Sequence, residues 1–414
     1  MTDPSVERVD VAIVGGGPAG LATAEALCRA GAPRIVVLER EAEPGGIPRH
    51  AKHQGFGLRD LHRSLSGPRY AERCLERAVA AGAEVRTHSQ VTGWSVDGAL
   101  EITSPLGREC LEAGAVVLAT GCRERPRAAR LVPGTRPQGV LTTGMLQQIV
   151  YLQGLRPGRR AVVVGAEHVS FSALFTLSHG GAHAVAMVTE HPRHQSFTAF
   201  RVGAVLRFRV PLVTESTVTA ILGKRRVEAV ELVHHGTGQV RRIACDLVVF
   251  TGDWIPDHEL AVLAGATLDQ GTLGPSVDPA FRTSRRGLFA AGNVLHGAET
   301  ADVAALSGRS AAASVLRYLE NEEWPTARVT IECEAPLHWI WPDALALGAG
   351  PPRTFRIRAR EILGTRNVVV SQDGRELWSG RVRRLMPGRS TRLTGGWVDK
   401  VDCDGGPVSA RLHV

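Results

Sequence analysis

Three glycines and one glutamate near the N-terminus have the spacing of a nucleotide-binding loop. Gly15, Gly17 and Gly20 follow a short apolar run, and Glu39 ends a second apolar run. In such a loop the first glycine permits a tight turn, the second lets the backbone approach a pyrophosphate, and the third lets the helix pack closely on the sheet. The acidic residue holds a ribose diol. The pattern predicts a dinucleotide-binding fingerprint, and it points to FAD.

The elements that must position these residues alternate apolar strands with helices. From residue 9 to about 121, Val/Ile/Leu runs alternate with helical stretches at 21–30 and 70–81, as is typical of a doubly wound domain. A second strand-turn-helix unit follows, and its closing run at 246–252 copies the run at 115–121. The predicted fold class is therefore α/β, with two Rossmann-like dinucleotide-binding domains, the second inserted in the first.

A change of character after Pro325 predicts a small β-rich C-terminal domain. Short strand-like runs alternate there with Gly, Pro and Asp, and several tryptophans could form either a core or a partner surface. The predicted domains are an FAD-binding domain of residues 1–125 and 281–322, an inserted NAD(P)-binding-like domain of residues 126–280, and a C-terminal domain of residues 325–414.

Composition narrows the function classes. The net charge of +8 is carried almost wholly by arginine without an aromatic-rich basic segment, so an acidic substrate, a partner subunit or plain solubility explains it better than nucleic acid. Seven cysteines are scattered without a Cys-x-x-Cys pair, which argues against a local redox disulfide and against a metal site. We expect no membrane span, no export signal and a cytoplasmic location.

The chain resembles the flavoproteins with two dinucleotide-binding domains that are related to glutathione and thioredoxin reductases. The resemblance rests on the first glycine loop, Glu39, the Ala-Thr-Gly run at 119–121, the second unit at Gly165 and the run at 289–293. Within that superfamily, the segments at 45–57 and 119–126 look most like the FAD subunits of opine oxidase, hydrogen cyanide synthase and heteromeric amino-acid dehydrogenases. The resemblance implies non-covalent FAD, a small-molecule substrate, and partner subunits or a homo-oligomer.

Carried over by position, the resemblance assigns a set of cofactor contacts. The glycine loop with Pro18 and Ala19 would meet the pyrophosphate, Glu39 with Arg40 the ribose, and the helix starting near Asp302 and Val303 the reduced edge of the flavin. The remaining implied contacts are Gly46, Ile47, Ala119, Thr120, Gly121, Gly292 and Asn293. Asn293 stands where the family usually has Asp, and Asp302 could merely cap its helix.

The loop after Gly46 departs from the disulfide reductases. Pro48 and His53 stand where the reductases have a Cys-x-x-x-x-Cys pair, which closes off dithiol chemistry at this place. If the loop runs as in the relatives, His53 faces the flavin ring and could take a proton while hydride moves. His50 is its competitor, and either histidine could instead bond the cofactor or stabilise the loop. Arg49 and Lys52 could anchor a substrate carboxylate.

The second glycine loop also departs from the pattern. Glu167 occupies the position of its second glycine and Ser170 that of its third. A carboxylate where a pyrophosphate should approach is electrostatically unfavourable and larger than glycine. We therefore expect weak or absent NAD(P)H binding. Glu190, at the end of the next strand, could hold a ribose or be a solvated strand end.

These departures favour electrons that come from a substrate. We expect a dehydrogenase or oxidase that takes hydride from a C–H bond beside an amine or hydroxyl of an amino acid, opine or hydroxy acid. Two alternatives stay open: an NAD(P)H-dependent reductase, and a scaffold subunit whose FAD only relays electrons. His296 and Glu299 are further site candidates, because they lie between Asn293 and the flavin-facing helix.

Overall fold

The computed structural model forms two compact units. It describes residues 7–413 except 197–201, 203–206, 298, 322, 326 and 347–353. Unit 1 contains Met1–Arg49, Gln54–Cys122 and Pro256–Val414, and unit 2 contains His50–His53 and Arg123–Ile255. The chain passes between the units on either side of His50–His53, in β9 (Cys122–Glu124) and in β18 (Trp254–Pro256). No helix among the described residues has the length and apolar character needed to span a membrane.

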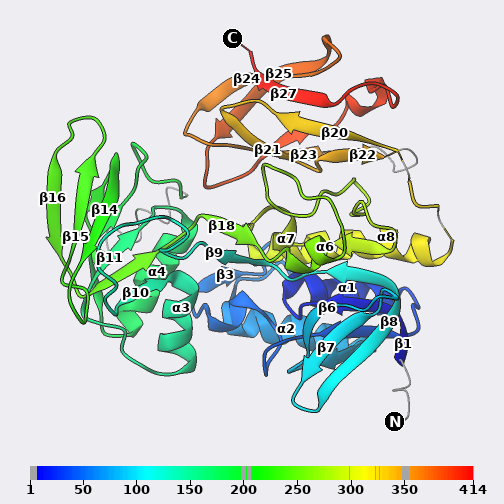
Figure 1. Ribbon diagram of the computed structural model, residues 1–414, viewed down its shortest axis with the longest axis horizontal. Coiled ribbons are helices and arrows are strands. Elements are labelled where there is room, and N and C mark those ends of the chain that lie inside the picture. Colours follow the sequence, from blue (N-terminus) through cyan, green and yellow to red (C-terminus); the bar gives the residue numbers. More distant parts are fainter. Residues whose placement is uncertain are drawn as a thin grey trace. The chain divides into compact units, whose positions relative to one another are not determined.

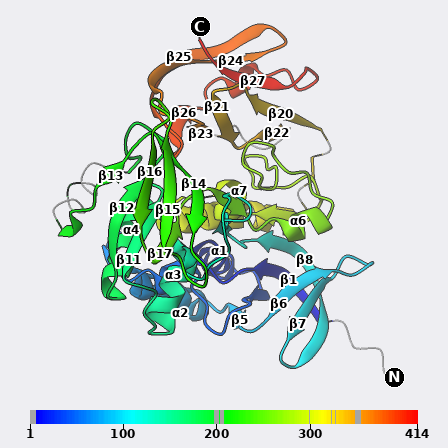
Figure 2. The same ribbon diagram turned by 60° about the vertical axis from the view of Figure 1, so that its left-hand side comes forward.

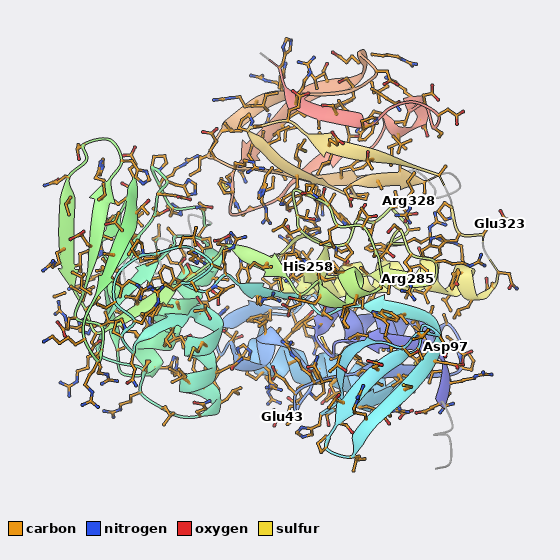
Figure 3. The ribbon with its side chains drawn as sticks, in the orientation of Figure 1. Glu43, Asp97, His258, Arg285, Glu323 and Arg328 are labelled. Carbon is orange, nitrogen blue, oxygen red and sulfur yellow. The ribbon has the colours of Figure 1, made fainter. Side chains whose placement is uncertain are left out.

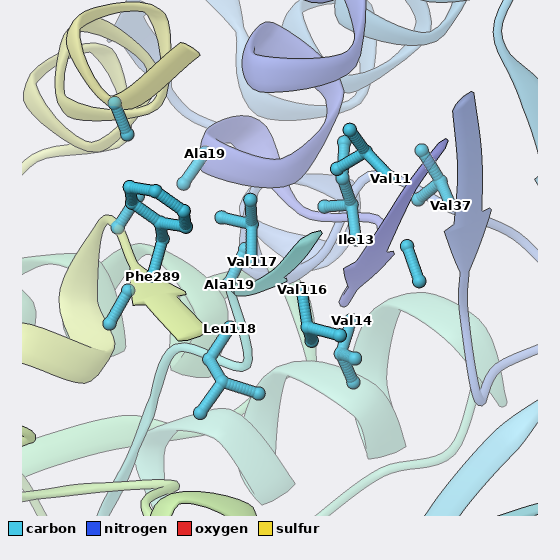
Figure 4. Packing of buried hydrophobic residues seen from close by; sticks show 14 of the residues in the cluster. Val11, Ile13, Val14, Ala19, Val37, Val116, Val117, Leu118, Ala119 and Phe289 are labelled. Atoms are coloured by element: carbon cyan, nitrogen blue, oxygen red, sulfur yellow. The ribbon is translucent and has the colours of Figure 1, made fainter. Parts of the chain in front are cut away.

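A twisted sheet with a parallel centre forms the base of unit 1. β1 runs between β2 and β8, parallel to both, and its residues from Val11 to Val14 are buried. Branched side chains buried on both faces are what a covered parallel sheet requires. Figure 4 shows Ile13, Val37, Val117 and Phe289 from four strands of this sheet. In spatial order the strands are β5 (Glu84–Arg86), β2 (Ile35–Leu38), β1 (Glu7–Val14), β8 (Gly107–Leu118), β7 (Leu100–Ser104) and β6 (Gln90–Trp94), with β19 (Leu288–Ala290) paired to β8.

Two helices of unit 1 pack unusually closely, α1 (Pro18–Arg29) and α8 (Ala301–Leu319), which lie together in Figure 1. A Cβ on Gly308 of α8 would lie 2.1 Å from the Ala19 carbonyl oxygen of α1, so only glycine fits there. Further short strands and helices follow the chain around this sheet: η1 (Ile47–His50), β3 (Gln54–Phe56), β4 (Leu65–Ser66), α2 (Gly67–Ala80), α6 (Glu259–Leu263) and α7 (Asn293–His296).

Unit 2 repeats the same local plan. A parallel sheet carries a strand, a tight turn and a helix, and a separate antiparallel sheet follows; both are drawn in green in Figure 2. The parallel sheet has the order β10 (Val140–Thr142), β17 (Leu247–Phe250), β11 (Arg160–Val164), β12 (His183–Val188) and β13 (Leu212–Val213). Its helices are α3 (Thr143–Gln147), the π-helical turn Gln148–Leu152 and α4 (His168–His179), and the antiparallel sheet is β14 (Ser216–Leu222), β15 (Ala229–His234) and β16 (Val240–Ala244).

The C-terminal part of unit 1 is a β structure with its own hydrophobic core. Trp397 is fully buried in that core and stacks on Phe355 with a ring-centroid distance of 4.7 Å. Arg328, labelled in Figure 3, reaches from β20 to the carbonyl oxygens of Arg282 and Thr283. One sheet has the order β22 (Ala344–Ala346), β20 (Arg328–Cys333), β27 (Val408–Leu412), β24 (Gly364–Gln372) and β25 (Arg375–Leu385), and the other β21 (Leu337–Trp341), β23 (Thr354–Ala359) and β26 (Thr391–Thr394), with η3 (Val398–Lys400) after it.

The predicted fold class is confirmed, while the units divide the chain differently from the predicted domains. His50–His53 belong to unit 2, and residues 325–414 are not separated from unit 1. The crossing in β9 lies near the predicted boundary at 125. Residues 256–280, which were predicted to end the inserted domain, belong to unit 1. The physical reason is apolar burial: Leu260, Ala261 and Val277 join the core of the unit 1 sheet, and Trp94 Nε1 donates to the Leu260 carbonyl oxygen at 2.9 Å.

Candidate functional site

Two glycines of the first loop are required by close backbone contacts, one with the turn after β8 and one within the loop. Gly15 has φ of +108°, and a Cβ there would lie 2.5 Å from the Ala119 carbonyl oxygen. A Cβ on Gly20 would lie 1.9 Å from the Gly15 carbonyl oxygen. The backbone therefore turns sharply out of β1 and starts α1 immediately behind the turn, as the sequence pattern predicts.

The N-terminus of α1 offers backbone donors to an anion. Its N-cap is Gly17, Pro18 and Ala19 begin the helix, and neither a side-chain cap nor an acidic residue is present in its first turn. A Cβ on Gly17 would meet only the Gly46 Cα, at 4.0 Å. Free N–H groups and the helix dipole together favour a phosphate at such a place.

Glu39 is buried at the end of β2 and is held from two sides. Its Oε2 accepts from the Gly16 N–H at 2.9 Å, and its Oε1 accepts from the Glu41 N–H at 2.8 Å. Each carboxylate oxygen keeps a further lone pair, so the predicted ribose contact is compatible with these bonds. Arg40 is exposed, and its guanidinium lies 3.9 Å from Asp257.

Gly46 brings the loop at residues 45–50 against the first glycine loop. It has φ of +60°, and its Cβ would lie 3.1 Å from the Gly17 Cα. Ile47 begins η1 and is 53% exposed. Arg49 forms an ion pair with Glu41 and donates to the Glu43 carbonyl oxygen. The structure thus gives Arg49 a role in holding the loop, beside its suggested role as a substrate anchor.

The turn after β8 lies next to the first glycine loop. The Ala119 N–H donates to the Val14 carbonyl oxygen at 2.8 Å, and Thr120 Oγ1 donates to the Asp257 carbonyl oxygen at 2.7 Å. Gly121 has φ of +78°, and a Cβ there would meet no atom within 4 Å. Hydrogen bonds of Ala119 and Thr120 therefore fix the turn, while the space beside Gly121 is not filled by neighbouring atoms.

Side-chain hydrogen bonds of Asn293 and Asp302 stabilise the segment from Gly292 to Val303. A Cβ on Gly292 would lie 2.6 Å from the Ala19 Cβ. The Asn293 amide accepts from the Glu299 N–H and donates to its carbonyl oxygen, both at 3.1 Å. Asp302 is buried, with its carboxylate accepting from the N–H groups of Arg59 and Val303, each at 3.0 Å. Asn293 and Asp302 therefore organise this segment, in addition to any contact with a cofactor.

The two histidines of the loop belong to unit 2. His50 is buried, and its Nδ1 lies 3.2 Å from the Gln147 Oε1, while the Gln147 Nε2 donates to Ser172 at 3.0 Å. Because the amide oxygen only accepts, His50 carries its proton on Nδ1. His53 is half-buried, with its ring 6.4 Å from that of Phe175. Lys52 is exposed over the ring of Tyr151, at 5.2 Å.

A side-chain carboxylate, that of Glu167, occupies the second glycine loop. The N-cap of α4 is Glu167, whose Oε2 accepts from the Ala166 N–H at 3.0 Å, and whose own N–H donates to the Ser170 Oγ at 3.2 Å. A Cβ on Gly165 would lie 2.8 Å from Glu167 Oε2, and one on Gly252 would lie 2.9 Å from Oε1. The carboxylate thus fills the space above both glycines and stabilises the start of the helix.

Two neighbouring charges complete the surroundings of Glu167. Burial, assisted by the charge of Glu167, raises the pKa of Glu124 to about 7. Arg130 donates to the carbonyl oxygens of Thr251 and Gly252 and interacts electrostatically with both carboxylates. A phosphate at this loop would meet the Glu167 carboxylate, with Glu124 and the Arg130 cation interacting with that carboxylate.

The turns of the two units can be compared directly. Gly17 and Glu167 are the N-caps of α1 and α4 and share an extended backbone, with φ of −80° and −92° and ψ of −175° and −174°. The space above Gly121 contains no atom within 4 Å of a built Cβ, while that above Gly252 contains the Glu167 carboxylate. One turn therefore presents donors to an anion, and the other satisfies them with a side chain.

Three residues near the site were missed by the sequence reasoning. Gly308 is required for the contact of α8 with α1, and Arg356 and Arg358 project from β23 toward the segment after Asn293. The alternation Phe-Arg-Ile-Arg at 355–358 is the signal that could have identified the arginines, because it puts both on the strand face opposite the apolar residues.

The fold and the paired glycine loops define a protein with two dinucleotide-binding domains. Residues 9–308 match the pyridine nucleotide-disulphide oxidoreductase family, and the chain belongs to it. Proteins of this family bind FAD, and many also bind NAD(P).

Several curated proteins are similar to the chain. It is 28% identical to the alpha chain of sarcosine oxidase from Rhizobium meliloti (strain 1021), over 80% of this chain and 33% of that protein. It is 29% identical to an opine oxidase subunit of Rhizobium meliloti, over 75% of this chain and 63% of that protein. It is also 30% identical to thioredoxin reductase of Treponema pallidum (strain Nichols), over 69% of this chain and 88% of that protein. The chain thus spans about a third to two thirds of the two oxidase subunits.

Solved structures share the fold. Thioredoxin reductase of T. acidophilum superposes with a TM-score of 0.63 at 24% identity, covering 75% of this chain and 99% of that one. L-proline dehydrogenase of P. horikoshii superposes with a TM-score of 0.54 at 18% identity, covering 78% of this chain and 58% of that one. At these identities the likeness concerns the fold.

Proposed function

We propose that the chain is the FAD-binding component of a dehydrogenase or oxidase whose electrons come from its substrate. The observation that carries the proposal is the Glu167 carboxylate, which lies where the second glycine loop would receive the pyrophosphate of NAD(P)H. With that donor disfavoured, a C–H bond beside an amine or hydroxyl is the electron source that suits a flavin. The substrates proposed are amino acids, opines or hydroxy acids.

The first glycine loop suits FAD. Its N–H groups are free of side-chain caps, Gly17 leaves room above the turn, and Glu39 supplies a fixed acceptor for hydroxyl groups. When bound there, FAD supplies the two-electron acceptor. Gly292 and Asn293 would border it, as the sequence resemblance implies.

We assign the movement of the substrate proton to His53, with His50 as its support. His50 holds its proton toward Gln147, which fixes the orientation of its ring. His53 follows His50 by three residues in the same loop and is half-buried beside Phe175. Imidazole, whose reference pKa is about 6.5, suits a general base near neutral pH.

Dithiol chemistry has little support in this chain. The sequence contains no Cys-x-x-Cys pair, and Pro48 and His53 occupy the loop positions discussed above. All seven cysteines lie among the described residues, and none of them forms a disulfide. Exchange with a disulfide substrate needs an attacking thiolate and a second thiol close by. Similarity to sarcosine and opine oxidase subunits supports an amine substrate, and similarity to thioredoxin reductase supports a disulfide, so the cysteine pattern is what argues against a disulfide.

A second candidate is a subunit whose FAD relays electrons for a partner chain. The similar chains of opine oxidase and sarcosine oxidase are both named as subunits, which favours this candidate. A partner subunit is compatible with either candidate. The two differ in whether the isolated chain reacts with a substrate.

Anaerobic mixing of the purified chain tests the proposal. NADH and NADPH should leave the flavin absorbance unchanged, and at least one member of a panel of amino acids, opines and hydroxy acids should bleach it. Rapid bleaching by a nicotinamide would overturn the proposal, and no bleaching by any compound would favour the relay subunit. His53→Ala should retain FAD and lower the rate of bleaching by roughly 10² or more. An unchanged rate would remove the assignment of His53.

A further inference from the structure

The positive charge of the chain belongs to unit 2. That unit has 18 Lys and Arg residues against 8 Asp and Glu residues, whereas unit 1 has 31 against 33. The net charge of +8 therefore comes from one unit alone. Such an asymmetry between parts of a chain indicates that the charged part meets an anionic surface.

The charges of unit 2 are separated along its parallel sheet. β10, β17, β11 and β12 run parallel, so their amino ends share one edge and their carboxyl ends the other (Figure 2). At the carboxyl edge, Glu167 follows β11, Glu190 follows β12 and Asp253 follows β17. A nucleotide-binding sheet receives its anion at the carboxyl edge. Unit 2 instead has carboxylates there and collects cations at the amino edge.

We call the amino edge with its cations the basic edge. Backbone hydrogen bonds join the segments that form it: the Asp246 N–H, before β17, donates to the Arg160 carbonyl oxygen at 3.0 Å. The Gln138 N–H, before β10, donates to the Arg225 carbonyl oxygen at 2.9 Å. The cations of the basic edge are all exposed, and they are Arg136, Arg156, Arg159, Arg160, Lys224, Arg225 and Arg226.

Few carboxylates neutralise the basic edge. Asp246 accepts from the backbone N–H groups of Arg159 and Arg160, the shortest of these bonds being 2.8 Å. Glu228 accepts from the backbone N–H of Lys224 at 3.3 Å. Within the described part of the chain, none of the seven cationic side chains forms an ion pair. Seven cations and two carboxylates leave a net charge of about +5 along the edge.

Two exposed leucines lie in the loop that carries Arg156. Leu155 is 56% exposed and Leu152 is 47% exposed. The Leu155 N–H donates to the Ile149 carbonyl oxygen at 2.9 Å, which fixes the start of the loop. The basic edge thus presents apolar side chains directly beside its cations.

This combination suits one kind of anionic surface best. A protein interface has a core depleted of charged residues, and single-stranded nucleic acid is bound by stacking on aromatic rings. The segments 152–160 and 223–228 contain no aromatic residue. Unpaired cations with a few exposed apolar side chains match the headgroup layer of an anionic bilayer, which attracts the cations and buries the apolar groups.

We propose that the basic edge of unit 2 binds reversibly to a membrane surface rich in anionic lipid, with Leu155 entering the headgroup layer. Each cation near such a surface strengthens binding about fivefold, so several together give a useful affinity without a pocket for one headgroup. The proposal is independent of the electron source, because neither Glu167 nor the candidate flavin site takes part. The glycine loop at the carboxyl edge stays free when the amino edge is bound.

Sedimentation of the purified full chain with vesicles tests the proposal. The probes are vesicles of phosphatidylcholine alone and vesicles in which about a third of the lipid is phosphatidylglycerol. The chain should sediment with the anionic vesicles and stay in solution with the neutral ones. Raising sodium chloride from about 0.05 M to about 0.5 M should release it, because salt screens exposed charges. Absence of binding to the anionic vesicles, or equal binding to both kinds, would overturn the proposal.

Paired variants assign the binding to the basic edge. The double substitution Arg225→Gln, Arg226→Gln should weaken binding to anionic vesicles roughly 25-fold. Its matched control is Arg381→Gln, Arg383→Gln, which removes the same charge from exposed positions of β25 in unit 1 and should bind like the parent. Both variants should melt like the parent, since they change exposed side chains only. Equal weakening in the two would show that net charge acts without the edge, and would overturn the proposal.

A second pair tests the apolar contact. Leu155→Ser should weaken binding about fivefold through loss of apolar burial. Leu106→Ser, at a fully exposed position of unit 1, should bind like the parent. Parent-like binding by Leu155→Ser would overturn the placement of Leu155 in the headgroup layer.

Two soluble polyanions distinguish lipid from other partners. Poly-L-glutamate represents an acidic protein surface, and a single-stranded oligonucleotide represents nucleic acid. If the chain ignores anionic vesicles and binds either polymer through Arg225 and Arg226, the edge serves that class of partner and the proposal is overturned. Bleaching of the flavin by nicotinamides would instead defeat the proposed function, while the vesicle result would still stand.

Discussion

Glu167→Gly should convert the second glycine loop into one that receives a dinucleotide. In the parent chain the Ala166 N–H donates to the Glu167 carboxylate at 3.0 Å, and the side chain fills the space beside Gly165 and Gly252. The substitution removes the charge and the bulk together and restores the second glycine of the loop, while Ser170 keeps the position of the third. Glu167→Gln is the companion variant, because it removes the charge while keeping the size.

The expected change in affinity follows from the distance between the charges. A phosphate oxygen that takes the Ala166 N–H would lie within about 4 Å of the Glu167 carboxylate. At an effective dielectric constant of about 20, two like charges at that distance repel by about 4 kcal/mol. This corresponds to roughly 10³-fold in the dissociation constant. Loss of the helix cap should cost the Gly variant no more than about 1–2 kcal/mol of stability.

Fluorescence titration of NADH and NADPH, together with anaerobic flavin absorbance, measures the effect. Glu167→Gly should bind one of the nicotinamides on the order of 10³-fold more tightly than the parent, and Glu167→Gln should recover only part of that gain. Glu228→Gln, a charge removal at an exposed position of unit 2, should leave affinity unchanged. Tight binding by the parent chain, or equal affinity in the parent and Glu167→Gly, would refute the reasoning.

Four other substitutions test the glycine loop and two buried polar residues. Gly20→Ala should cost about 3 kcal/mol and release FAD, because its Cβ would lie 1.9 Å from a carbonyl oxygen. Gly17→Ala, with no atom nearer than 4.0 Å, should melt like the parent yet retain less FAD. An FAD content equal to that of the parent in either variant would contradict this. Burial raises the pKa of Asp343 to about 7, above its unfolded value, so stability should fall as the pH rises from about 4 to 7. Asp343→Asn should flatten that fall in melting experiments, and a variant with the parent's pH dependence would exclude Asp343 as its source. His50→Ala should lower stability by about 1–3 kcal/mol through loss of its buried hydrogen bond, as measured by urea unfolding, and unchanged stability would show that the bond contributes little.

Much of the α/β fold could be predicted because its signals are local. The tight turns at Gly15 and Gly165 and the apolar runs of β1, β8, β11 and β17 lie within short segments whose periodicity indicates their structure. The assignment of residues 256–280 was harder, because it depends on which sheet Leu260 and Val277 cover. Such a choice is made by tertiary packing, and the spacing of apolar residues does not reveal it.

The site shows the same division between local and distant signals. Glu167 was recognised from its place in the glycine loop, and the structure adds that the carboxylate caps α4 and bonds the loop, so the residue that disfavours a phosphate also stabilises the helix. Arg358 follows Glu299 by 59 residues and lies in another sheet, so its meaning depends on a contact between distant segments. Asn293 and Asp302 were predicted as cofactor contacts, and their hydrogen bonds show that they also shape the segment that meets Arg358. A loop motif can therefore be read from a short segment of sequence, whereas a contact such as that of Arg358 with Glu299 is set by tertiary packing and leaves no local signal.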